Sequence, residues 1–136
     1  MDLIAGIAFL VRAVGMIFVA AAALLHVFIA GVEMFGWTGS LARRLFNLEP
    51  AFARQTREMA ANQGLYNLML AIEMIVGLGA AITGADWGLK LALAGAVSTV
   101  IAGAFLFVTS PDKRSSALKQ LTPGLIGSIL LILGGL

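Results

Sequence analysis

Residues 13–35 form an almost entirely apolar stretch that is long enough to cross a bilayer, since about 20 apolar residues span the hydrocarbon core. Only His26 and Glu33 interrupt it, and they are seven positions apart, so they share one face of a helix. The chain is 60% hydrophobic with a mean hydropathy of +1.00, and its 136 residues are too few to bury such helices in a soluble core. The sequence therefore predicts an integral membrane protein.

Three further apolar stretches extend this prediction to four spans. We expect spans at about 13–36, 65–84, 89–109 and 117–136. Short connections between them predict an all-α, up-down-up-down four-helix bundle that forms one transmembrane domain over 1–136. A single helix over 2–35 would measure about 50 Å, against a bilayer core of about 30 Å. We therefore expect 2–12 to be a separate interfacial segment that bends near 12–15, with a strongly tilted single helix as the alternative.

Small residues recur at four-residue spacing in the last two spans, where they allow helix backbones to approach closely in lipid. They predict the surfaces through which spans three and four pack. These residues are Gly95, Thr99, Gly103, Gly124 and Ser128.

Residues 37–64 form the one extended polar segment, and Pro50 is expected to open a helix within it. Apolar side chains alternate there with arginines, a pattern typical of short amphipathic helices on an anionic membrane surface. A solvated helical loop is the alternative. Seven of the nine basic residues fall in the first and third loops, so the positive-inside rule predicts cytoplasmic loops and external termini. These seven are Arg43, Arg44, Arg54, Arg57, Lys113, Arg114 and Lys119.

Helical counting predicts that polar residues of spans one and two meet in two layers. His26 and Glu73 each lie about 3 Å from the centre of their span, so they can pair near the midplane. Glu33 lies about 13 Å from the centre, at the depth of Tyr66 and Asn67. The three-four spacing predicts that the face of span two towards span one contains Gln63, Tyr66, Leu70, Glu73 and Gly77.

A His–Glu pair at this depth can relay a proton, bind a cationic or hydrogen-bonding ligand, act as acid and base, or simply hold two helices together. One His and two Glu without a Glu-x-x-His motif do not favour a metal site. Haem ligation by His26 is weaker still, so no cofactor is assigned. No phosphate-binding loop or nucleic-acid signature is present, and no nucleic-acid partner is expected.

The runs HVFIAGVEMFGW (26–37) and ARQTREMAANQGLYNLMLA (53–71) resemble the small bacterial membrane proteins of the domain of unknown function 1304 family. The resemblance rests on chain size, four spans, a first-span His-x6-Glu-Met-Phe and an Ala-Asn-Gln-Gly-Leu-Tyr-Asn block before span two. It implies a bacterial plasma (inner) membrane location but supplies no activity. Glu73 and residues 1–12 are not features associated with the family. The family's role would be carried by His26, Glu33, Asn62, Gln63, Gly64, Tyr66 and Asn67.

The preferred hypothesis is a polar pocket between spans one and two, open to the cytoplasmic side, that binds a small polar ligand or lipid headgroup. Alternatives are an accessory subunit of a larger membrane complex, a small proton-coupled transporter, or an intramembrane enzyme that uses its His and Glu as acid and base. Expected partners are the lipid bilayer and other membrane subunits or copies of the same chain. The predicted ligand-binding residues are His26, Glu33, Asn62, Gln63, Tyr66, Asn67 and Glu73.

Overall fold

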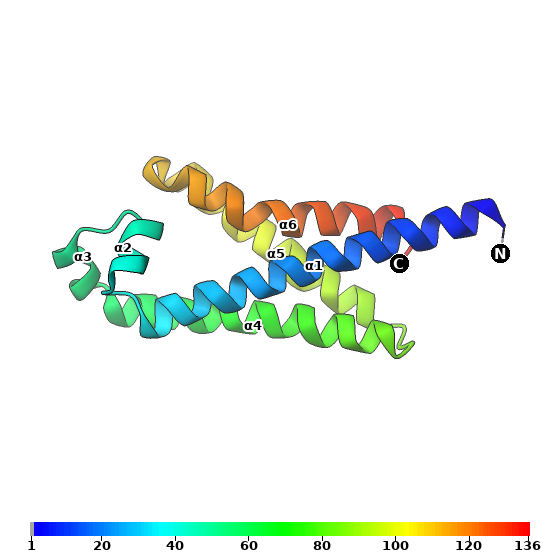
Figure 1. The fold of residues 1–136 in the computed structure, drawn as a ribbon, viewed down its shortest axis with the longest axis horizontal. Helices are drawn as coiled ribbons and strands as arrows, with labels where there is room; N and C mark the ends of the chain where they lie inside the picture. Colours follow the sequence, from blue (N-terminus) through cyan, green and yellow to red (C-terminus); the bar gives the residue numbers. More distant parts are fainter. Residues whose placement is uncertain (1) are drawn as a thin grey trace.

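The computed structural model describes residues 2–136 as four long helices joined by turns and two short helices (Figure 1). The short helices and a 3-10 turn fill two of the connections, and no strand occurs within the described residues. This confirms the predicted all-α fold with four helices that are long and apolar enough to cross a membrane. The elements are α1 (Leu3–Phe35), α2 (Ser40–Leu45), α3 (Pro50–Gln55), α4 (Arg57–Ile82), α5 (Gly88–Thr109), η1 (Pro111–Lys113) and α6 (Arg114–Leu133).

The four long helices form a ring in which α1 packs on α4, α4 on α5, α5 on α6 and α6 on α1. Consecutive long helices run in opposite directions, as Figure 1 shows. Close contacts agree, since Gly15 near the start of α1 lies against Leu131 near the end of α6, and Val19 lies against Gly127. The order in which the helices cross a membrane stays a prediction.

Small residues bring these helices into backbone contact. A Cβ on Gly77 of α4 would collide with the backbone of Ala92 on α5. In the same contact, a Cβ on Gly88 would collide with the backbone of Ala81. The small residues predicted to pack spans three and four are all buried between helices: Gly95, Thr99, Gly103, Gly124 and Ser128.

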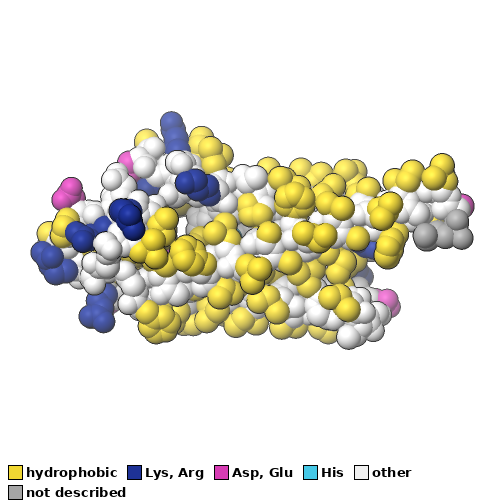
Figure 2. Space-filling view, viewed as in Figure 1, with side chains coloured by type: hydrophobic (Ala, Val, Ile, Leu, Met, Phe, Trp, Pro, Cys, Tyr) yellow, Lys and Arg dark blue, Asp and Glu magenta, His cyan; other side chains and the backbone are white. Residues whose placement is uncertain are grey.

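The interior of the ring is apolar, and so is most of its outer surface. The inner cluster consists of small and medium side chains from all four long helices, and it includes Val19, Met74 and Leu131. Large apolar side chains cover the outside, as the yellow atoms along the bundle show in Figure 2. Helices that are apolar on every side are expected where lipid replaces water. Burial therefore supports a membrane-embedded bundle.

The prediction that 2–12 form a separate segment is wrong. α1 continues unbroken over Leu3–Phe35, with no helix boundary near 12–15. The side chain of Asp2 caps its start by accepting from the Ala5 amide at 2.7 Å, and Gly15 keeps its helical conformation against the backbone of α6. The prediction relied on bilayer thickness, but a helix that is too long can tilt instead of breaking. Met1 lies outside the described residues, and where the embedded part of α1 begins stays a prediction.

The other helices also extend beyond the expected spans. α4 begins at Arg57 and α6 at Arg114, so each starts with a polar turn or more before its apolar part. Pro50 is the first residue of α3, as predicted, because a first-turn residue needs no amide donor. Pro123, in contrast, lies well inside α6, where its ring nitrogen cannot donate to the carbonyl of Lys119.

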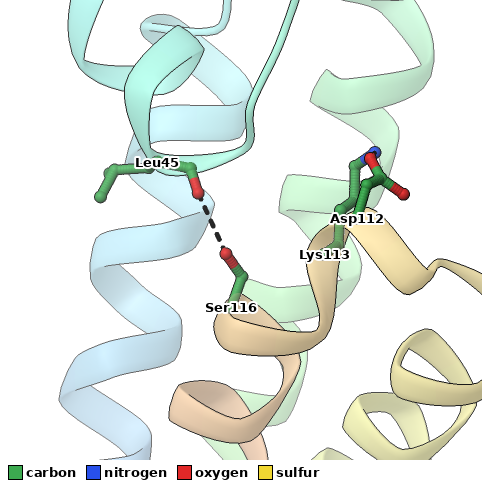
Figure 3. Close-up of polar contacts among 4 residues, drawn as sticks. All are labelled: Leu45, Asp112, Lys113 and Ser116. Atoms are coloured by element: carbon green, nitrogen blue, oxygen red, sulfur yellow. Dashed lines mark hydrogen bonds and ion pairs between the residues drawn. The ribbon is translucent and has the colours of Figure 1, made fainter.

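The first and third loops lie at the same end of the bundle. Ser116 at the start of α6 donates its hydroxyl hydrogen to the carbonyl oxygen of Leu45 at the end of α2, at 3.0 Å (Figure 3). Beside it, Lys113 and Asp112 form an ion pair of 2.9 Å (Figure 3). Most of the Lys and Arg side chains visible in Figure 2 gather at this end, around α2 and α3. We call it the basic end.

Candidate functional site

A buried hydrogen bond joins α1 to α4 towards the basic end. Asn67 donates from Nδ2 to Oε2 of Glu33 at 2.7 Å, and the two side chains are 5% and 6% exposed. The sequence predicted this contact, and the structure contains it. Because burying a carboxylate is unfavourable unless it is hydrogen-bonded, the amide is the group that makes this position tolerable for Glu33.

Gly64 explains why the two helices come close enough for that bond. A Cβ on Gly64 would lie 2.6 Å from Cγ of Met34 and 3.0 Å from both the Ala30 carbonyl oxygen and Cβ of Glu33. A side chain at this position would displace the Met34 side chain and press on the Ala30 carbonyl oxygen of α1. Since Gly64 and Asn67 are three residues apart on α4, they share the face that contacts α1.

Glu33 keeps one carboxylate oxygen available. Oε2 accepts from Asn67, whereas Oε1 has no hydrogen-bond partner among residues 2–136. No Lys, Arg or His of the described chain forms an ion pair with this carboxylate, the one such pair being that of Lys113 with Asp112. An ionised carboxylate only accepts hydrogen bonds, so Oε1 can take one from a ligand donor.

His26 is also buried, at 2% exposure, two turns before Glu33 on the inner face of α1. Its Nδ1 lies 2.8 Å from the carbonyl oxygen of Ala22. Because a carbonyl oxygen can only accept, Nδ1 carries the hydrogen and Nε2 is left as an acceptor. Within the part of the chain that is described, Nε2 has no hydrogen-bond partner.

The predicted pairing of His26 with Glu73 is wrong. No hydrogen bond or ion pair between the described residues joins them, and Glu73 is only half-buried on α4. The predicted inner face of span two is wrong at Gln63 and Tyr66, which are exposed, Tyr66 to 55%. Asn62 is exposed as well. Gly77 is buried as predicted, but it lies against α5 and not against α1.

The inner face of α4 differs from the predicted one by one residue, which is about 100° of helix rotation. The buried residues recur at three-four spacing but are mostly small, and small residues are the ones that pack in lipid. The prediction followed the polar side chains, whereas Gly64 and Ala71 carried the informative signal. The buried face consists of Ala60, Gly64, Asn67, Ala71, Met74 and Gly77.

One known protein family matches most of the chain. The profile of the family described as "Protein of unknown function (DUF1304)" matches residues 20–132. The chain belongs to the DUF1304 family. The matched range includes His26, Glu33, Gly64 and Asn67, and it leaves out the first turns of α1. No curated protein and no solved structure matches the chain.

Three hollows are described on the surface of this DUF1304 protein. One, of about 560 Å³, lies at the basic end, and a second, of about 800 Å³, lies at the opposite end beside Arg12, Asp86 and Lys90. A third, of about 90 Å³, lies between α1, α2 and α6. None of these three is lined by His26 or Glu33. No three His, Asp or Glu side chains of residues 2–136 come together as metal ligands.

The hollow at the basic end contains residues that sequence reasoning did not place in a binding site. Its position depends on Trp37, which donates from Nε1 to the Thr56 hydroxyl at 2.9 Å and packs against Phe46 at 5.2 Å between ring centroids. These contacts tie the end of α1 to α2 and to the start of α4. The hollow is lined by Thr38, Arg43, Pro50, Arg54 and Arg57.

Proposed function

We propose that this DUF1304 protein is a membrane-embedded binding protein that takes a small polar ligand or a lipid headgroup between α1 and α4. The observation that supports this proposal is the hydrogen bond between Glu33 and Asn67, buried between two apolar helices. An ionisable side chain at membrane depth is unfavourable by a few kcal/mol, and it is usually paired and functional. Glu33 is paired only through one oxygen, which leaves acceptor capacity for a ligand.

The two side-chain atoms without hydrogen-bond partners indicate which kind of ligand can bind. Oε1 of Glu33 and Nε2 of His26 are both acceptors, and they lie on one helix face about 10 Å apart along the axis. A ligand with an ammonium group or several hydrogen-bond donors therefore suits them, and an anion does not. A ligand that reaches both atoms has to pass the close contact that Gly64 makes with Met34 and with the Ala30 carbonyl oxygen of α1.

Native mass spectrometry of the full chain, extracted in mild detergent, tests this proposal. We expect the wild-type protein to retain a small molecule and the Glu33→Gln variant to lose it, because a neutral amide attracts a cationic donor less. The matched control is Glu58→Gln, which neutralises an exposed carboxylate on the same helix as Asn67. Retention by Glu33→Gln, or a wild-type protein that carries no small molecule, would contradict the proposal.

The same buried carboxylate also suits a small proton-coupled transporter, in which Glu33 would exchange a proton for a cationic substrate. Transport of a cationic dye by reconstituted vesicles distinguishes the two functions. A transporter requires a pH gradient and fails in Glu33→Gln, whereas a binding protein shows no flux. If mass spectrometry instead shows a retained protein chain, an accessory subunit is the better description.

We further propose a plasma-membrane location with the basic end in the cytoplasm and both termini outside. The gathering of basic side chains at one end of the bundle supports this orientation through the positive-inside rule (Figure 2). The chain has no Cys, so single cysteines report sidedness directly. In intact cells an impermeant maleimide should label Thr83→Cys and spare Ser115→Cys, and the reverse pattern would overturn the orientation.

A further inference from the structure

The hollow at the basic end is built from separate elements that meet in space. Thr38 follows α1, Arg43 lies on α2, Arg54 on α3, and Arg57 is the first residue of α4. Three arginines from three helices therefore line one volume of about 560 Å³. Arg44, the neighbour of Arg43 on α2, does not line it.

These three arginines have no partners within residues 2–136. None of them forms an ion pair or a side-chain hydrogen bond, although the polar segment also contains Glu49 and Glu58. Nε of Arg43 is buried from solvent and has no acceptor. Because solvent does not reach this atom, the exposed Arg54 and Arg57 are the arginines that a ligand in the hollow meets most directly.

Two other cations at the same end have partners, whereas Arg44 and Lys119 form no ion pair within residues 2–136. Lys113 pairs with Asp112 at 2.9 Å. Arg114 donates from Nε to the carbonyl oxygen of Phe107 at 3.2 Å, and its guanidinium carbon lies 5.0 Å from the centre of the Phe107 ring. What distinguishes the hollow is that three arginines without partners line one volume.

We propose that this hollow binds the phosphate group of an anionic ligand. A guanidinium presents planar, paired donors that match phosphate oxygens, and several of them converge here with the hydroxyl of Thr38. The phosphate can belong to a membrane phospholipid or to a soluble compound. This inference shares no residue with the proposed site at Glu33, so either can fail without the other.

Lipid binding is tested with the full chain in nanodiscs of phosphatidylcholine and phosphatidic acid, from which native mass spectrometry reports the retained lipid. The wild-type protein should retain phosphatidic acid in preference to phosphatidylcholine. The double variant Arg54→Gln/Arg57→Gln should lose that preference by about fivefold for each exposed arginine removed. Arg44→Gln is the matched control, because it removes an arginine of the same end that does not line the hollow.

Soluble phosphate is tested by calorimetric titration of the detergent-solubilised protein with inorganic phosphate, using chloride as the reference anion. Phosphate binding that disappears in Arg54→Gln/Arg57→Gln supports a soluble ligand, whereas lipid selectivity without it supports a phospholipid headgroup. The phosphate proposal is overturned if neither probe binds, or if Arg44→Gln weakens binding as much per charge as the double variant. Unfolding curves of all variants confirm that each protein remains folded in the assay.

Discussion

α4 packs closely against α5 on one side and against α1 on the other, and the two contacts differ in chemistry. Towards α5, Gly77 brings the helix against the backbone of Ala92, and no side-chain hydrogen bond of the described residues crosses that contact. Towards α1, Gly64 packs against the Met34 side chain and the Ala30 carbonyl oxygen, and a hydrogen bond from Asn67 to Glu33 accompanies this contact. Both contacts depend on a glycine, and only one carries a carboxylate.

The difference shows that close packing in this bundle does not require the polar pair. α4 and α5 approach to backbone contact with apolar and small residues alone, as expected where van der Waals packing drives association in lipid. Glu33 and Asn67 therefore need an explanation beyond packing. The predictions below test how far the two sides of α4 differ, in order of decreasing effect on stability.

The largest effect is expected on the apolar side. Gly77→Val places carbon atoms where the backbone of Ala92 lies, so α4 and α5 must separate, and we expect a loss of about 3 kcal/mol in unfolding free energy. Gly79→Val is the matched control, because a Cβ there meets nothing within 4 Å. Unfolding by dodecyl sulfate in mixed micelles measures both variants. Equal losses would show that helix propensity, and not the contact, is responsible.

On the polar side, Asn67→Ala removes the donor and leaves Oε2 of Glu33 buried without a partner. We expect a loss of about 1–2 kcal/mol, because a buried acceptor then lacks its hydrogen bond. Asn62→Ala removes an exposed amide from the same helix and should change stability little. The same unfolding assay reports both. A neutral Asn67→Ala would mean that water or a ligand already satisfies Glu33.

A weaker polar contact lies at the basic end. Ser116→Ala removes the hydrogen bond to the carbonyl of Leu45, and we expect a change of about 0.5–1 kcal/mol, confined to the attachment of α2. Hydrogen exchange of the α2 amides should become faster, while that of α4 stays unchanged. Ser115→Ala, at the exposed neighbouring position, serves as the control. Faster exchange throughout the bundle would show that this bond has more than a local role.

The smallest effect on stability is expected when the polar side is made apolar. Glu33→Leu/Asn67→Leu replaces both partners together, and such replacements of buried polar pairs are often neutral, so we expect a change within about 1 kcal/mol. Retention of a small molecule in native mass spectrometry should nevertheless be lost. If the double variant unfolds much more easily than the wild-type protein, the pair has a mainly structural role. The difference between the two contacts of α4 would then not point to a binding function.

Sequence reasoning predicted the fold well because hydrophobic length is a strong constraint. Stretches such as 89–109 correspond closely to a helix of the structure, α5 over Gly88–Thr109. The predicted break near 12–15 was wrong, because bilayer thickness limits how much of a helix is immersed and does not limit how long the helix can be.

For the candidate site, depth along the helix axis was predictable but rotation about it was not. Counting residues brought Glu33 to the level of Asn67, which is correct because the rise per residue is fixed. The pairing of His26 with Glu73 and the placement of Tyr66 failed, because a face was assigned from polar side chains alone. In lipid the contact face is chosen by side-chain volume, which Gly64 revealed and hydropathy did not.

The unequal lengths of the helices have a consequence for the surrounding lipid. α1 has 33 residues and α5 has 22, so the two differ by about 16 Å in length within one ring. A bilayer that matches α5 therefore leaves part of α1 outside its core unless α1 tilts, and mismatch is unfavourable by a fraction of a kcal/mol per ångström. The tilt of α1 and the thickness of the surrounding lipid are thus coupled.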